Sequence, residues 1–127
     1  KLYTKGSFSE KDQVLILDTM GMLSSIYQYA DFALVGGGFS GALHNILEPA
    51  VWGCHLSFGP LTSKFPEAQE FVAEGFAHSI VDQNQWIVTI SELNSDNLKL
   101  EALKTKAKNY TSAKMGTTSR IISSISL

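Results

Sequence analysis

The sequence predicts an α/β fold, a doubly wound parallel sheet of the Rossmann-like type. Two observations predict it. Short apolar runs alternate along the chain with segments of helical spacing, and the connections between them are short. In addition, the apolar run Phe32–Val35 leads into four glycines within residues 36–41, and a helix-like stretch follows. Strands that alternate with helices pair in parallel, and such sheets bind ligands beyond the carboxyl ends of their strands.

Each element has a local signal. Short apolar runs bounded by polar or turn residues predict strands at residues 14–17, Phe32–Val35, His55–Phe58 and 77–81. Helical spacing predicts helices at residues 22–29, 43–52, 67–74, 97–114 and 117–125. Gly75 is the expected C-cap of the third of these helices. Residues 86–93 stay open between strand and helix, because their β-branched side chains favour a strand while their position favours a helix.

Composition sets the broad class. The chain has 127 residues, 44% of them hydrophobic and 17% charged, with a net charge of −2, as is typical of one soluble globular domain. This charge balance does not indicate a nucleic-acid partner. No apolar run reaches the roughly 20 residues of a membrane-spanning helix. The only cysteine, Cys54, excludes an internal disulfide, and we interpret it as a small core residue.

Positive charge gathers in the last quarter of the chain. Six basic residues stand there against one acid, Glu101. The basic residues are Lys99, Lys104, Lys106, Lys108, Lys114 and Arg120. Two interpretations stay open: a solvated helix face, or a surface that lies near anionic lipid or an acidic substrate.

The consecutive glycines Gly36, Gly37 and Gly38 form the first candidate site. They fit a tight turn, or a backbone that a ligand approaches closely, and their place before a helix favours the ligand. Free N–H groups at a helix start lie at the positive end of its dipole and suit an anion such as phosphate. The spacing lacks the downstream acid of a dinucleotide fingerprint and the Gly-Lys-Ser/Thr of a P-loop, so both classes are disfavoured.

Three polar residues follow the glycines. His44 is either a surface histidine or a donor to a phosphate or carboxylate oxygen. Asn45 is either an ordinary helix cap or a ligand contact. Glu48 lies four residues after His44, on the same face of the predicted helix, and it is either a first-turn acid or an enclosed acceptor for a ribose diol.

Topology predicts where these residues meet. Three loops, at residues 18–23, 36–45 and 59–65, follow predicted strands and should line one edge of the sheet. No Cys/His/Asp cluster has metal-ligand spacing, and no Ser/His/acid arrangement is readable. We therefore predict no metal site in this chain and no cofactor.

The chain resembles the C-terminal domain of the 3-deoxy-D-manno-octulosonic acid (Kdo) transferases, which are GT-B glycosyltransferases. The match runs from Val14 to about Ala77 and continues weakly beyond. Its most specific part is the string His-Asn-Ile-Leu-Glu-Pro, which begins at His44 and follows the triple glycine. Further matching residues are Asp18 to Leu23, Tyr27 to Asp31, Gly53, Phe58-Gly59-Pro60, Lys64-Phe65 and Glu67-Ala68.

The resemblance implies a CMP-Kdo donor. By analogy with other GT-B enzymes, the glycine loop and a helix starting near His44 would hold the donor phosphate, and Glu48 would bind the ribose hydroxyls. The loop that holds Gly21, Met22 and Leu23 would border the base. The family usually has Glu where Met22 stands here, so any contact from that carboxylate is lost.

The resemblance also implies a larger enzyme. Residues 1–127 would be the donor-nucleotide domain, the C-terminal half of a GT-B fold, in a fragment that lacks the N-terminal acceptor domain. The catalytic acid/base, the acceptor site and the membrane anchor belong to that other domain, so we expect no turnover from this chain alone. The full-length enzyme would transfer Kdo to a lipid A precursor in lipopolysaccharide synthesis, at the cytoplasmic face of the bacterial inner membrane.

Two alternatives remain at this stage. One is a GT-B domain that uses a UDP-sugar donor. The other is a non-catalytic nucleotide-binding module on the same fold, because fold alone does not determine function.

Overall fold

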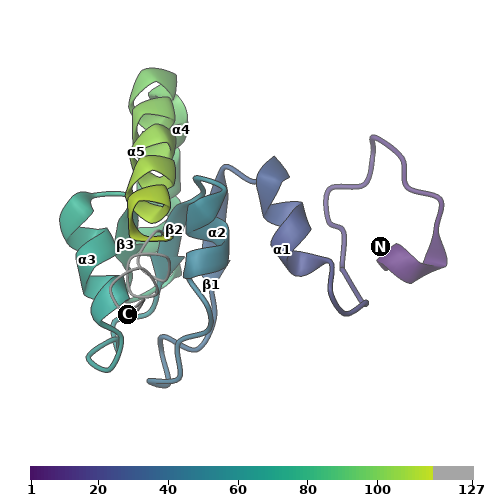
Figure 1. Cartoon of the computed structure of the whole chain (residues 1–127). Coiled ribbons are helices and arrows are strands. Elements are labelled where there is room, and N and C mark those ends of the chain that lie inside the picture. Colours follow the sequence, from purple (N-terminus) through teal and green to yellow (C-terminus); the bar gives the residue numbers. More distant parts are fainter. Residues whose placement is uncertain (116–127) are drawn as a thin grey trace, which may run out of the picture.

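A computed structural model describes residues 1–115 of the chain. Its centre is a three-stranded parallel sheet in the order β1-β2-β3 (Figure 1). The strands are β1 (Phe32–Val35), β2 (His55–Phe58) and β3 (Ala77–Ser79). Phe32 of β1 pairs with His55 of β2, and Leu56 of β2 pairs with Ala77 of β3. The predicted α/β class with parallel pairing is confirmed.

Helices connect and flank the strands. They are α1 (Leu23–Ile26), α2 (Leu47–Val51), α3 (Pro66–Glu74), α4 (Gln83–Ser95) and α5 (Asn97–Met115), with 3-10 turns η1 (Tyr3–Lys5) and η2 (Tyr27–Tyr29). Helix α3 begins with Pro66, whose fixed φ suits the first helical position. It ends at Gly75, which has a left-handed φ of 85°, as the sequence predicted. Helix α4 begins after Asp82, whose carboxylate accepts the Gln85 N–H.

The hydrophobic core lies on one face of the sheet. Leu56 and Phe58 of β2 are fully buried there, beside Ala33 and Val35 of β1. Helices α2, α3 and α5 add Ala50, Phe71 and Ala107 to the same cluster. The opposite face is more polar: buried His55 and Ser57 lie on it, and His55 Nε2 is 2.7 Å from Nδ1 of His78 in β3.

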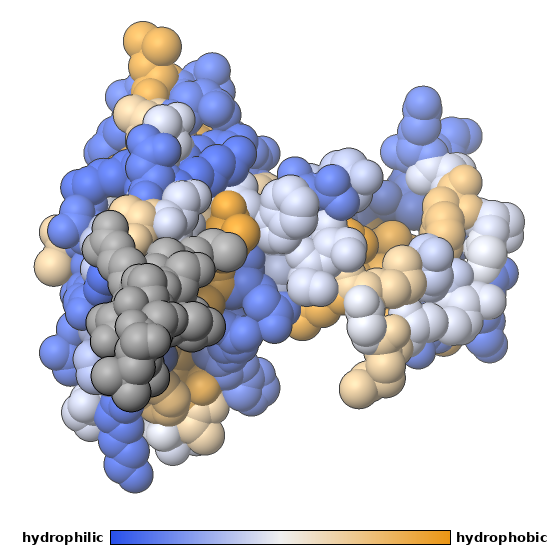
Figure 2. All heavy atoms as spheres, viewed as in Figure 1, coloured by the Kyte–Doolittle hydropathy of each residue, from blue (hydrophilic) through white to orange (hydrophobic). Residues whose placement is uncertain are grey.

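The strand predicted at residues 14–17 is wrong. The structure has only one isolated bridge there, between Leu2 and Ile16. Val14, Leu15 and Ile16 are 65%, 45% and 53% exposed. This N-terminal segment lies beyond α1 and away from the sheet (Figure 1), with hydrophobic side chains on its surface (Figure 2). Among the described residues no strand of the sheet lies beside this run, so its apolar side chains have no core to enter.

The helix predicted at residues 43–52 is shorter than expected, and its start is corrected to Leu47. Pro49 supplies the physical reason. A helix from residue 43 would place this proline in its interior, where the ring clashes with the preceding turn, whereas a start at Leu47 puts Pro49 in the first turn. His44 therefore lies in the loop before α2, and its N–H donates to the Gly36 carbonyl at 3.0 Å.

The remaining elements agree broadly with the predictions. Residues 22–29 form α1 followed by η2, and residues 97–114 fall within α5. The segment left open between strand and helix is helical, in α4. Strand β3 ends at Ser79, two residues before its predicted end. The helix predicted at residues 117–125 lies outside the described residues.

Candidate functional site

A cavity of about 410 Å³ opens at the carboxyl end of β1. It is the place where the topology of a parallel sheet predicts ligand binding. Half of its lining residues are apolar or aromatic, and the other half are glycine or polar. The lining residues are Leu23, Tyr27, Leu34, Val35, Gly36, His44, Asn45 and Glu48. The structure thus brings together four of the residues singled out for their chemistry: Gly36, His44, Asn45 and Glu48.

Contacts within the chain determine the shape of the glycine loop, residues 36–41. Gly37 has a φ of 85°, and a Cβ there would lie 1.9 Å from the Ala42 carbonyl oxygen. Gly38 crosses Gly59 so closely that a Cβ on Gly38 would lie 2.6 Å from the Gly59 nitrogen. Gly37 and Gly38 therefore have packing reasons that need no ligand. Gly36 alone of the three lines the cavity.

Two of the three predicted loops are joined by this crossing. The Leu61 N–H donates to the Gly38 carbonyl at 2.9 Å. Residues 36–45 and 59–65 therefore share one edge of the sheet, as predicted. From the third loop, residues 18–23, only Leu23 reaches the cavity. Gly21 has no atom outside its neighbours within 4 Å of a built Cβ, and Met22 lies just before α1 without lining the cavity.

Several amides of the glycine loop are already in use. The N–H groups of Ser40 and Ala42 both donate to the Gly37 carbonyl, and the N–H of His44 donates to Gly36. Helix α2 has only five residues, so its dipole is small. An anion at this site would therefore depend more on the exposed His44 imidazole than the sequence suggested. A Cβ on Gly36 would lie 3.5 Å from Nδ1 of that ring.

Asn45 and Glu48 contact each other. The Asn45 Nδ2 donates to Glu48 Oε1 at 2.8 Å, and Asn45 Oδ1 accepts the Leu47 N–H at 2.9 Å. The second bond satisfies the first amide of α2 from one residue before the N-cap position, Ile46, so Asn45 caps the helix in place of that apolar side chain. Glu48 is half-buried and lines the cavity, which agrees with the predicted partial enclosure.

Tyr27 is a site residue that the sequence analysis did not select. Its ring lines the cavity from η2, and burial together with the nearby Glu48 carboxylate raises the pKa of its phenol. A signal was present: Tyr27 follows Leu23 by four residues in a helical segment, so both occupy one face and line the same cavity.

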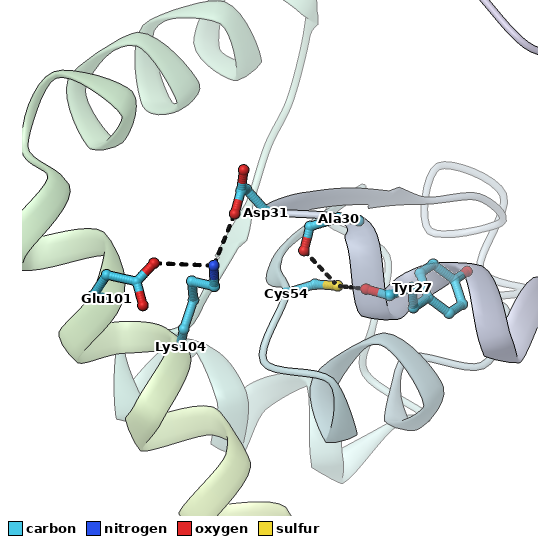
Figure 3. Close-up of polar contacts among 6 residues, drawn as sticks. All are labelled: Tyr27, Ala30, Asp31, Cys54, Glu101 and Lys104. Carbon is cyan, nitrogen blue, oxygen red and sulfur yellow. Dashed lines mark hydrogen bonds and ion pairs between the residues drawn. The ribbon is translucent and has the colours of Figure 1, made fainter.

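Cys54 anchors the segment that carries Tyr27. Its Sγ is 3.4 Å from the carbonyl oxygens of both Tyr27 and Ala30, positioned to donate to them (Figure 3). The side chain is fully buried, as predicted, and burial raises the pKa of the thiol. Cys54 is therefore a packing residue that helps to place one wall of the cavity.

Three of the five lysines of α5 form ion pairs within the described residues. Lys104 contacts both Asp31 and Glu101, at 2.8 and 3.0 Å (Figure 3). These hydrogen bonds raise the pKa of Lys104. Ion pairs also join Lys106 to Glu74 and Lys114 to Glu70. This pairing favours the interpretation of a solvated helix face over a lipid-facing surface, while Arg120 lies outside the described residues.

Two further features of the described residues bear on the type of site. Across residues 1–115, no three His, Cys, Asp or Glu side chains are grouped as metal ligands would be. Within the same residues, each helix is too short or too polar to cross a bilayer.

Comparisons with known proteins point to one family. No protein-family model matches the chain. The chain is 34% identical over 95 residues to the 3-deoxy-D-manno-octulosonic acid transferase of Aquifex aeolicus, a match over 72% of this chain and 27% of that protein. It is 31% identical over 111 residues to the transferase of the same name from Chlamydia trachomatis serovar D, covering 86% of this chain and 26% of that protein. The chain thus spans about a quarter of the length of these relatives.

A solved structure points to the same family. The crystal structure of the C-terminal CMP-Kdo binding domain of WaaA from Acinetobacter baumannii superposes with a TM-score of 0.69 at 26% identity. The match covers 84% of this chain and 56% of that one.

Proposed function

Since the comparisons identify this chain as a C-terminal domain of the Kdo transferase type, we propose that it binds the CMP-Kdo donor in the cavity beyond β1. One observation carries the proposal: His44, Asn45 and Glu48, the most specific part of the resemblance, line a single cavity together with Gly36. A nucleotide needs an acceptor for its ribose diol, a donor for its phosphate and a flat apolar surface for its base. The cavity has a candidate group for each: Glu48 for the diol, His44 for the phosphate, and Leu23 with Tyr27 for the base.

Each part of the donor has a matching group. The half-buried Glu48 carboxylate would accept hydrogen bonds from the ribose hydroxyls. The His44 imidazole would donate to the phosphate, beside Gly36. Leu23 and Tyr27 would border the base, while Gly21 and Met22 precede Leu23 in the same loop and do not line the cavity. Gly37 and Gly38 would act by holding the loop in shape.

These groups also suit the departure of CMP. Donors held in place near the phosphate would stabilise the negative charge that develops there as the glycosidic bond breaks. The role requires no metal ion. The proposal gives this chain no catalytic acid or base, and no activity of its own.

The activity of the whole protein is part of the proposal. The transferase would carry its catalytic residue and its site for the lipid A precursor on an N-terminal domain. Transfer of Kdo would take place at the cytoplasmic face of the inner membrane. The extent of the match supports this: 72% of this chain aligns with only 27% of the Aquifex aeolicus relative.

A nucleotide titration tests the donor class. We expect binding of CMP, followed by calorimetry or by NMR of the cavity residues, to exceed binding of UMP and of UDP. A preference for UDP would replace the CMP-Kdo proposal with a UDP-sugar donor. Absence of binding to all three would contradict a nucleotide site.

A double cycle on Glu48 tests the ribose contact. Replacing CMP by 2′-deoxy-CMP should weaken binding to the wild type by about 1–3 kcal/mol, because a hydrogen bond to a charged acceptor is lost. The same change of ligand should matter much less to Glu48→Ala, since the acceptor is already gone. Glu67→Ala is the matched control, because Glu67 is also half-buried and also the second residue of its helix, but lies outside the cavity. Additive losses would mean that Glu48 is structural.

A further inference from the structure

The hydrogen bonds around Asn45 point to a role that deepens the proposed function and rests on it. We propose that Asn45 is a positioning residue: it holds the Glu48 carboxylate so that one oxygen stays available for the donor ribose, and it does not contact the donor itself.

Both ends of the Asn45 side-chain amide are in use. The Oδ1 accepts the Leu47 N–H at 2.9 Å, and the Nδ2 donates to Glu48 Oε1 at 2.8 Å. This orientation is chemically required. A flipped amide would set N–H against the Leu47 N–H and a carbonyl oxygen against the carboxylate, and neither pair can form a hydrogen bond. Asn45 therefore links the start of α2 to the Glu48 side chain in one arrangement.

The two oxygens of Glu48 are not equivalent. Oε1 is occupied by Asn45, whereas no group of the described residues donates to Oε2. Glu48 lines the cavity and is half-buried as a residue. A carboxylate that is already fixed loses less rotamer freedom when a ligand binds. The free oxygen is thus prepared to accept from a ribose hydroxyl.

Asn45→Asp separates the two bonds of the amide. The aspartate keeps an acceptor for the Leu47 N–H, so the cap survives and folding should be unchanged. It loses the donor to Glu48 and brings a second negative charge beside it, so the carboxylates repel each other and the shared pKa of the pair rises. We expect CMP affinity at pH 7 to fall about 10-fold or more, since a hydrogen bond to a charged group is replaced by repulsion.

The pH profile distinguishes positioning from direct contact. As the pH falls through the raised pKa of the pair, a shared proton can again bridge residue 45 and Glu48. The ratio of wild-type to Asn45→Asp affinity should then return toward one. The penalty for 2′-deoxy-CMP should also be smaller in Asn45→Asp than in the wild type, because the ribose contact is the one that is lost. Asn84→Asp, an exposed position on α4 away from the cavity, is the control for the added charge.

Each outcome of these experiments contradicts a different claim. If folded Asn45→Asp binds CMP as tightly as the wild type, the positioning role of Asn45 is wrong, while the proposed CMP site is unaffected. A loss that does not recover at low pH, or an undiminished 2′-deoxy penalty, overturns positioning in favour of a direct contact with the donor. A folded wild type that binds no CMP overturns the proposed function itself, and the ligand named here with it. NMR titration of the Glu48 carboxyl without ligand checks independently whether residue 45 and Glu48 interact. An identical titration in the wild type and in Asn45→Asp would overturn that interaction.

Discussion

Two apolar runs of four residues, Phe32–Val35 and residues 14–17, have opposite positions in this molecule. The first forms β1, pairs with β2, and buries Ala33 and Val35 to 9% and 6% exposure. The second lies in the N-terminal segment, where Val14 is 65% exposed. Their hydrophobicity is similar, so the difference lies in the surroundings. A run becomes a strand where neighbouring backbone can pair with it and helices can cover it.

Two of the glycine-containing loops differ in the same way. Residues 36–45 are held by hydrogen bonds of their own backbone and by the crossing of Gly38 with Gly59. Residues 18–23 have Gly21 in open space. The first loop can hold a ligand-binding group in place, whereas the second contributes only Leu23 to the cavity.

The largest expected contrast concerns burial. Leu56→Ala should lower the free energy of unfolding by about 2–5 kcal/mol, because the side chain is fully buried and its loss leaves a cavity. Ile16→Ala should change it by less than about 0.5 kcal/mol, since that side chain is 53% exposed. Denaturant unfolding measures both. Similar losses would mean that residues 14–17 are packed as firmly as the sheet.

Acid should weaken the sheet before it weakens the N-terminal segment. Burial and the neighbouring His78 lower the pKa of His55 to about 4. The unfolded chain takes up this proton near the ordinary value of 6.5, so stability should fall as the pH drops from about 6.5 to about 4. The loss is on the order of 3 kcal/mol. His55→Leu should remove this part of the pH dependence.

The N-terminal segment responds at lower pH. Hydrogen bonds from Thr4 lower the pKa of the exposed Asp18 carboxyl below its ordinary value of 3.8. The charged form is favoured when the contact is made, so the contact should persist until the pH falls below that value. NMR titration of the His55 ring and of the Asp18 carboxyl measures the two transitions. Loss of the Thr4–Asp18 contact above pH 5 would contradict this order.

A smaller contrast concerns the two loops. Gly38→Ala should cost roughly 1–3 kcal/mol, because its Cβ would overlap the backbone of Gly59. Gly21→Ala should cost only about 1 kcal/mol, the strain of a left-handed φ of 85° in open space. Thermal unfolding compares the variants. If Gly21→Ala is the more damaging one, the N-terminal loop must be packed in a way that its open surroundings exclude.

The smallest effect is expected on the surface of α5. Lys104→Gln removes the ion pairs with Asp31 and Glu101, and the loss should stay below about 1 kcal/mol, because both acids are exposed. The loss should shrink further at high salt. Denaturant unfolding at two salt concentrations measures it. A larger, salt-independent loss would show that the lysine stem contributes mainly by packing.

Local sequence was sufficient for several elements and for part of the lining of the candidate cavity. The runs Phe32–Val35 and His55–Phe58 are strands as predicted, and Gly75 ends α3 with a left-handed φ. The string that begins at His44 does lie at the carboxyl end of a parallel strand. These features depend on residues close together in the chain, whose turn preferences and spacing can be read directly. Pro49 explains why α2 begins at Leu47, whereas helical spacing alone predicted an earlier start.

Contacts between distant residues account for what local pattern could not predict. Gly37 lies against the Ala42 carbonyl and Gly38 crosses Gly59, so both glycines have packing reasons that the local pattern did not indicate. Cys54 contacts the carbonyl of Tyr27, 27 residues away, and helps to bring that ring into the cavity. Residues 14–17 carry the pattern of a buried strand but have no sheet beside them among the described residues. Hydrophobicity is a property of one segment, whereas burial requires a second segment to meet it, so chain topology and packing determine which apolar runs and which glycines build the site.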